Sequence, residues 1–204
     1  MDAHGETLLR LVMAEGAAAP LNLLLQHGFM LQTRVGCSLD RFLKEQLGLS
    51  PEYIMENIQT IFLDSKPVDD LDKAIVKDGT HLALSAAMPG LVGAAMRRGG
   101  AYSSLRGTIT YEEREGQGVS GQGIVHMKLF NLLMQDLGPR LLRKGIIVTG
   151  PDLSDFLTRQ IDAFWMGLRG IFLEGRPVGK DLLLAQVMLL QSGSVRLVAE
   201  TEEA

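Results

Sequence analysis

The chain has 204 residues, of which 46% are hydrophobic and 22% charged, and its formal net charge is −4. This composition is typical of a globular protein and excludes a largely disordered chain, because disorder requires low hydrophobicity and high net charge. A slightly acidic chain has no general attraction to nucleic acids or anionic lipids, so we expect neither as a partner. The single cysteine, Cys37, excludes an internal disulfide and is typical of a reducing compartment.

The amino-terminal stretch does not have the pattern of a signal peptide. Asp2 and Glu6 precede its first basic residue, whereas a signal peptide starts with positive charge. Its apolar runs are interrupted by polar residues, and none reaches the roughly 20 residues needed to cross a bilayer. We therefore expect a cytoplasmic protein with no membrane association.

The first elements along the chain are two strands and a helix. Residues 20–26 and 30–35 predict two strands around a tight turn at Gly28. The segment SLDRFLKEQLG (38–48) then predicts a helix with Ser38 as its N-cap and a glycine as its C-terminal stop. Its apolar residues recur at the spacing of one helix face, and they are Leu39, Phe42, Leu43 and Leu47.

Two further strands follow the helix. NIQTIFLD (57–64) alternates in the manner of a strand, and SKPV (65–68) predicts a turn because Pro67 fixes φ and donates no hydrogen bond. Asp78-Gly79 predicts another turn, after which residues 80–85 predict the last strand of this half.

An apolar segment rich in small residues connects the two halves. One interpretation is a short helix over residues 90–98, and the other is a segment that binds a partner or a second copy of the chain. The candidate partner surface consists of Leu91, Val92, Met96, Arg97 and Arg98.

The second half predicts a similar series. A strand at 124–130 is followed by a loop or helix near 137–145 and a strand at 145–150. Residues 151–164 then predict a helix, which Asp152 or Ser154 could cap. Its apolar stripe consists of Leu153, Phe156, Leu157 and Ile161. The last strands are predicted around IFLEGRPV and SVRLVAE.

The two halves repeat each other. IFLDSKPV at 61–68 recurs at 171–178 as IFLEGRPV. Three further pairs of segments match in the same order: 36–43 with 150–157, 79–86 with 193–200, and 21–26 with 130–135. This order of matches indicates an internal duplication.

Each repeat has the element order strand, strand, helix, strand, turn, strand. One amphipathic helix across such a sheet covers one face, which is the β-grasp arrangement. We therefore expect an α+β protein with two β-grasp units: residues 1–86 with an amino-terminal extension, a linker or hairpin segment at 87–122, and residues 123–204.

The stretch FLDSKPVDDLDKAIVKDGTHLALSA (62–86) resembles the carboxyl-terminal half of the ubiquitin-like sulfur carriers, the small subunit of molybdopterin synthase and its thiamine-biosynthesis relative. Their N-G-x-P-V turn and later Asp-Gly turn correspond to Lys66-Pro67-Val68 and Lys77-Asp78-Gly79 here. The resemblance implies a terminal Gly-Gly that is adenylated and then thiolated or transferred. Gly99-Gly100 is internal, so a carrier role requires cleavage after Gly100. The alternative is an ordinary linker.

The remaining motifs do not predict a cofactor, metal or catalytic site. Residues 116–123 contain G-x-G-x-x-G, but the acidic stretch before them is unlike a buried strand, so we expect a loop and not a dinucleotide site. None of the four histidines has metal-ligand spacing. Cys37 precedes a helix, where its pKa could fall, but Pro151 takes its place in the second repeat, so we expect a structural role.

We therefore expect a non-catalytic cytoplasmic adaptor with a protein partner, no cofactor and no metal, and with a homodimer as an open possibility. The first alternative is a sulfur carrier or ubiquitin-like modifier processed after Gly100. The second alternative is a nucleotide-binding protein that uses the loop at 116–123.

Overall fold

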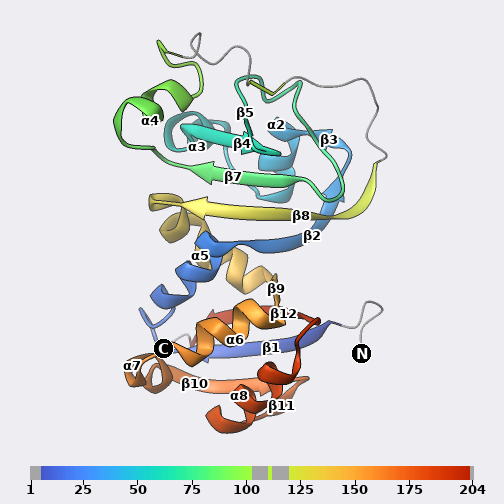
Figure 1. Ribbon diagram of the computed structural model, residues 1–204, viewed down its shortest axis with the longest axis vertical. Coiled ribbons are helices and arrows are strands. Elements are labelled where there is room, and N and C mark those ends of the chain that lie inside the picture. Colours follow the sequence, from blue (N-terminus) through green and yellow to red (C-terminus); the bar gives the residue numbers. More distant parts are fainter. Residues whose placement is uncertain (1–5, 103–109, 112–119, 203–204) are drawn as a thin grey trace. The chain divides into compact units, whose positions relative to one another are not determined.

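The computed structural model describes residues 6–102, 110–111 and 120–202, and it combines helices with mixed β-sheet (Figure 1), so the chain is an α+β protein. It divides into two compact units. Unit 1 comprises residues 1–29 and 134–204, and unit 2 comprises residues 30–133. Unit 1 is thus built from both ends of the chain, a division that differs from the sequence-based boundaries at 86 and 122.

Unit 1 has a mixed sheet in the order β11-β10-β1-β12-β9 (Figure 1). Its strands are β1 (Thr7–Met13), β9 (Ile146–Thr149), β10 (Leu168–Leu173), β11 (Arg176–Pro177) and β12 (Ser194–Thr201). Strand β1 is central: it runs antiparallel to β10 and parallel to β12. Its alternate side chains, Leu9, Leu11 and Met13, are fully buried, as the period-two pattern of a half-covered strand requires.

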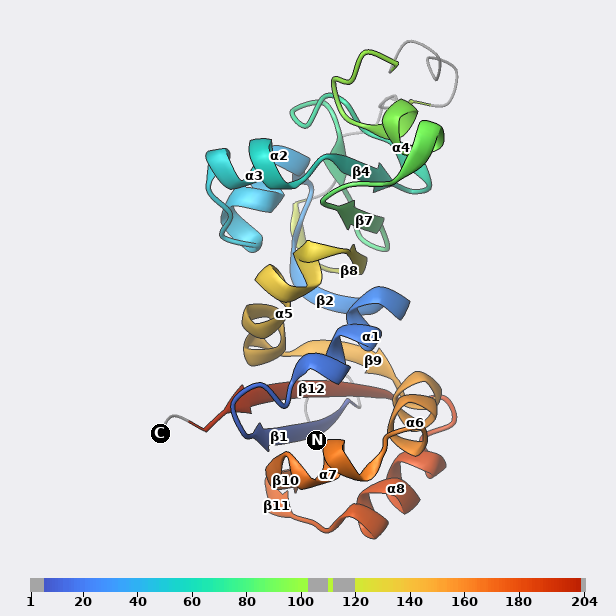
Figure 2. The ribbon, with the colours of Figure 1, turned by 90° about the vertical axis from the view of Figure 1, so that its left-hand side faces the viewer.

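The helices of unit 1 cover this sheet. They are α1 (Asn22–His27), which follows a 3₁₀ turn at Ala19–Leu21, α5 (Leu132–Lys144, in unit 1 from Met134 onward), α6 (Gly150–Thr158), α7 (Asp162–Met166) and α8 (Lys180–Leu189). Helix α6 packs against β9, β12 and α8, and Figure 2 shows α6 and α8 side by side. Its predicted stripe of Leu153, Phe156 and Leu157 is buried.

Unit 2 has a sheet in the order β2-β8-β7-β4-β5 and a small second sheet of β3 and β6. Its strands are β2 (Phe29–Val35, in unit 2 from Met30 onward), β3 (Cys37–Ser38), β4 (Thr60–Leu63), β5 (Lys66–Pro67), β6 (Ile75–Val76), β7 (His81–Ser85) and β8 (Gly121–Phe130). Strand β7 is antiparallel to β4 and parallel to β8.

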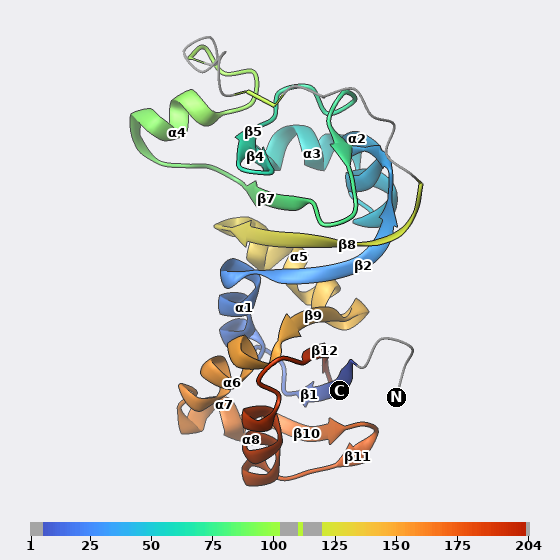
Figure 3. The ribbon, with the colours of Figure 1, turned by 45° about the vertical axis from the view of Figure 1, so that its right-hand side comes forward.

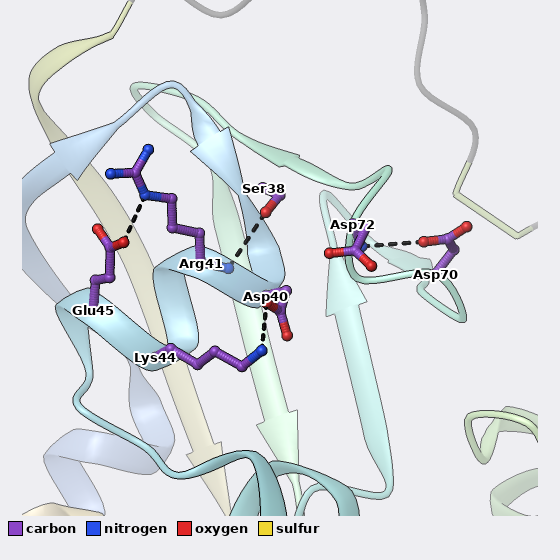
Figure 4. A network of polar contacts seen from close by, with 7 residues as sticks. All are labelled: Ser38, Asp40, Arg41, Lys44, Glu45, Asp70 and Asp72. Atoms are coloured by element: carbon purple, nitrogen blue, oxygen red, sulfur yellow. Dashed lines mark hydrogen bonds and ion pairs between the residues drawn. The ribbon is translucent and has the colours of Figure 1, made fainter.

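The predicted helix at 38–48 is confirmed. It consists of α2 (Leu39–Arg41) and a π-helical turn at Phe42–Gln46, and the Ser38 hydroxyl accepts a hydrogen bond from the Arg41 amide at 3.3 Å. All four residues of its apolar stripe are buried. Its exposed face carries ion pairs at i,i+4 spacing, Arg41 with Glu45 and Lys44 with Asp40 (Figure 4). The described part of unit 2 also contains helices α3 (Pro51–Asn57) and α4 (Gly90–Met96).

Two separate β-grasp units, each formed by one half of the sequence, are not evident. In unit 1 the partner of β10 is β1, from the amino terminus, and not β12. In unit 2, β7 pairs with β4 on one side and, on the other, with β8, which begins the second half. The alternation predicted at 124–130 contains no information on which sheet β8 joins, and no strand was predicted at Thr7–Met13.

Several local predictions were wrong. Residues 20–26 do not form a strand, because Asn22–His27 are helical; this Leu-rich run lacks β-branched residues, and both Leu and Gln favour helices. The first hairpin turns at Asp64-Ser65, and Pro67 pairs with Phe62 instead of turning.

The predicted helix at 151–164 was also wrong in detail. It begins at Gly150, and Thr149 caps it in place of Asp152 or Ser154. It ends at Thr158, so Ile161 lies outside the stripe and is 72% exposed.

Candidate interaction surface

The predicted partner surface lies on α4, which occupies part of the expected linker. The helix follows Pro89 and ends before Arg97. Leu91 and Val92 are 74% and 64% exposed. Gly93 is the buried residue of the helix, and a Cβ added there would lie only 1.9 Å from the Met88 carbonyl oxygen. Glycine at this position therefore lets α4 lie directly on its own preceding loop while the two apolar side chains point outward.

The segment that enters α4 is anchored by hydrogen bonds. The Asn131 side-chain amide donates to the Ala87 carbonyl and to the Ser85 hydroxyl, the latter at 3.1 Å. The Ser85 hydroxyl donates to the same Ala87 carbonyl at 3.2 Å. Asn131 has a φ of 58°, a left-handed conformation that asparagine tolerates better than most residues. The end of β7 and the end of β8 thus hold the entry to α4 together.

The segment that leaves α4 is anchored by Arg98. Its amide donates to the Gln59 carbonyl at 2.8 Å, and its guanidinium donates to the Ile54 carbonyl at 2.9 Å. Partial burial lowers the pKa of Arg98, and the carboxylates of Asp69 and Asp40 oppose that effect. Arg98 therefore points inward and anchors the segment, so it does not belong to the outward surface that the sequence predicted.

The Gly99-Gly100 pair lies in a hydrogen-bonded turn within unit 2. The Gly99 amide donates to the Asp69 carboxylate at 3.2 Å, and the Gly100 amide donates to the Arg97 carbonyl at 3.2 Å. Gly99 has a φ of +60°, which favours glycine. Even after cleavage at Gly100, these two hydrogen bonds would have to break before the glycine pair could enter an activating enzyme.

The structure describes only the end of the Gly-rich motif at 116–123. Gly116 and Gly118 lie outside the described residues, and Gly121 begins strand β8. Phosphate binding by such a motif requires a helix amino terminus directly after the glycines. A strand in that place presents its amides to neighbouring strands instead.

Neither the pKa of Cys37 nor the placement of the described histidines indicates a reactive centre. Burial raises the pKa of the Cys37 thiol, and the nearby Arg41 guanidinium opposes this effect. Within the described ranges, no three His, Cys, Asp or Glu side chains are grouped as metal ligands.

The structure does bring two histidines together that the sequence did not connect. His81 and His126 occupy the same register position of β7 and β8, and their rings stack with centroids 4.5 Å apart. Burial and the neighbouring His81 lower the pKa of His126, while Asp78 opposes them. Only the pairing of two strands from different halves creates this contact, so no sequence spacing could have revealed it.

No protein-family model matches the sequence, and no similar protein was found among curated proteins or solved structures. The resemblance to sulfur carriers therefore stays a prediction. Over the part of the chain that the structure describes, no helix combines the length and apolar character that crossing a bilayer would need.

Proposed function

We propose that this chain is a non-catalytic cytoplasmic adaptor that presents helix α4 to an apolar site on a partner protein. The observation that carries the proposal is a short helix, anchored on both sides, that exposes Leu91 and Val92. Burial of such side chains by a partner is worth about 1.5–3 kcal/mol each. The anchors at Asn131 and Arg98 order the helix in advance, which lowers the entropic cost of binding.

We also propose that the two repeats are β-grasp modules derived from one ancestor. The hairpins β4–β5 and β10–β11 support this, because their pairings correspond residue by residue: Phe62 with Pro67 in one, and Phe172 with Pro177 in the other. In both, the valine after the proline donates to the isoleucine of the first strand, at 2.9 Å. Identical registers in two segments far apart in the sequence favour duplication, with an exchange of strands between the modules.

The test compares partner binding by three proteins. Tagged wild type, a Leu91→Glu/Val92→Glu double variant and a Met55→Glu control would be used to capture partners from the native cell. Met55 is 74% exposed on α3 and so tests the general effect of an added charge. We expect a protein that binds wild type and control but not the double variant. The affinity of that purified protein should fall at least about 100-fold with the double variant.

Equal binding of such a protein to all three variants would contradict the assignment of α4. Circular dichroism of the double variant should match that of wild type, because both substituted side chains are exposed.

The sulfur-carrier alternative is tested separately. The intact mass of the protein from its native cell should correspond to the uncut chain, because the turn at Gly99-Gly100 is hydrogen-bonded within unit 2. A species that ends at Gly100, or that carries a thiocarboxylate there, would overturn the adaptor proposal in favour of the carrier.

A further inference from the structure

The sheet of unit 1 ends in the short strand β11, where Pro177 offers a backbone carbonyl to the outside. Strand β11 is the last in the strand order and has β10 as its neighbour (Figure 3). The Val178 amide donates to the Ile171 carbonyl, whereas Pro177 stands opposite Phe172. Because hydrogen-bonded and non-hydrogen-bonded pairs alternate in an antiparallel ladder, the Pro177 carbonyl points away from β10. Among the described residues, no other backbone amide donates to it.

The equivalent carbonyl in unit 2 is occupied by another segment of the same chain. Pro67 stands opposite Phe62 in the same register, and its carbonyl accepts a hydrogen bond from the Tyr111 amide at 2.9 Å. Both Pro67 and the following Val68 are buried. This hairpin therefore shows what its edge accommodates, which is a passing peptide segment that donates one backbone amide to the proline carbonyl.

The hairpin of unit 1 keeps the residues of that edge but lacks the cover. The Pro-Val pair recurs as Pro177-Val178, and Arg176 keeps the positive charge of Lys66. In unit 1, however, the proline is exposed and the valine is only half-buried. An apolar edge with an outward carbonyl is the kind of surface to which a peptide segment from another chain adds.

Charge indicates which kind of segment fits this edge. Arg176 is exposed on β11, and the neighbouring Glu174 carboxylate already accepts a hydrogen bond from the Leu8 amide at 2.6 Å. In the sequence, Tyr111 is followed by two glutamates at 112–113. A segment of the same type, with an aromatic residue followed by acidic residues, is complementary in charge to Arg176.

We propose that the β10–β11 hairpin binds an acidic peptide segment of a partner protein, through an aromatic residue whose backbone amide donates to the Pro177 carbonyl. The occupant is a different protein and not a second copy, because the Tyr111 segment of this chain is already bonded to its own Pro67. The contact is small, so an isolated peptide binds weakly, with a dissociation constant on the order of 1 mM. This surface is distinct from α4, and the inference does not rest on the proposed function.

The first experiment is an NMR titration of the full-length chain with a synthetic peptide that has the sequence of residues 107–113. The amides of Arg176, Val178 and Gly179 should shift and saturate. A peptide N-methylated at its tyrosine should cause no shift there, because it lacks the donor. N-methylation at the preceding threonine is the control and should preserve binding, since successive amides of an extended segment point to opposite sides.

The absence of shifts in β11, or equal binding of the peptide N-methylated at tyrosine, would overturn the inference. Shifts confined to residues 66–68 would also overturn it, because the peptide would then occupy the hairpin of unit 2.

The second experiment uses the duplication as its own control. Arg176→Glu should weaken binding of the unmodified peptide about fivefold, because a surface charge pair is lost and repulsion is added. Lys66→Glu makes the same change at the equivalent position of unit 2, which is also exposed, and should leave binding unchanged. Equal weakening by both substitutions, or by neither, would contradict binding of the acidic segment at β11.

Discussion

The hairpins β4–β5 and β10–β11 have nearly the same sequence and the same backbone, yet their surroundings differ. In both, the residue that opens the turn has a positive φ, 48° at Asp64 and 51° at Glu174. In both, its carboxylate accepts a hydrogen bond from the amide of the adjacent strand, at 2.8 Å from His81 and at 2.6 Å from Leu8. The local sequence therefore determines the hairpin, and in both units the turn carboxylate is bonded to the strand beside it.

The difference lies in what covers the hairpins. In unit 2, Pro67 and Val68 are buried, and the Tyr111 amide donates to the Pro67 carbonyl at 2.9 Å. In unit 1, Pro177 is exposed and Val178 is only partly buried. Identical side chains thus contribute differently to stability, because burial depends on neighbouring segments and not on the hairpin itself.

The largest effect is expected from removal of β1. A chain that begins at Ala14 lacks three core side chains of unit 1, each worth about 1.5–3 kcal/mol, together with the central strand of the sheet. This loss is comparable to the whole stability of a small domain, about 5–15 kcal/mol, so unit 1 should unfold while unit 2 stays folded. Fluorescence of Trp165, the only tryptophan, reports on unit 1, and hydrogen exchange reports on both.

If residues 1–86 folded as one module, the same truncation would instead expose the amides of β4 and β7. If the amides of β10 and β12 stayed protected from hydrogen exchange in the shortened chain, that result would contradict the proposed exchange of strands between the modules.

The next largest effect is expected from shortening the equivalent isoleucines of the two hairpins, which should lower the free energy of unfolding by different amounts. Ile61 is 1% exposed and Ile171 is only partly buried. Ile61→Ala should cost about 3 kcal/mol of unfolding free energy, and Ile171→Ala about 1 kcal/mol. Urea unfolding followed by hydrogen exchange in each unit measures both values. Equal costs would mean that the two hairpins are equally covered in solution.

A smaller effect is expected from exchange of the second turn residues. Ser65 and Gly175 have φ values of 66° and 76°, which glycine adopts more readily. Gly175→Ser should cost about 1 kcal/mol through the backbone alone, since a Cβ there meets no atom within 4 Å. Ser65→Gly should stabilise unit 2 by only about 0.5 kcal/mol, because relief of the positive φ is partly offset by the entropy that glycine adds to the unfolded chain. Changes of the same sign at both positions would contradict equivalent turns.

The smallest effect is pH dependence in unit 2 alone. His126 has a pKa below 6.5 in the folded state, because of its burial and of His81. The unfolded chain therefore binds the proton first, and the stability of unit 2 should be full above about pH 6.5 and should fall as the pH decreases through that value. In unit 1 the equivalent positions are occupied by Leu8 and Arg196, so no pair of histidines stands there.

Hydrogen exchange of each unit at pH 7.5 and pH 5.5 tests this prediction. His126→Gln should remove the difference in unit 2, and His27→Gln, an exposed histidine on α1, is the control. An unchanged pH dependence in His126→Gln would exclude the stacked pair as its cause.

Much of the local structure was predictable from the sequence. The helix at 38–48, its Ser38 cap and its apolar stripe depend on spacings of three or four residues, and all were confirmed. The short helix near 90–98 was confirmed as Gly90–Met96. The inward anchoring of Arg98 was not predictable, because its acceptors at Ile54 and Gln59 lie far away in the sequence.

The sequence by itself determined the capped helix at 38–48, the strands around the two Ile-Phe-Leu triplets and the alternation that marks β8 as a half-buried strand. Only the tertiary structure decided that β1 joins β10 and that β8 joins β7. Turns and helices depend on interactions within a few residues, so their energetics are contained in short segments. A strand offers the same backbone groups to any neighbour, and its partner is selected by the burial of the whole sheet.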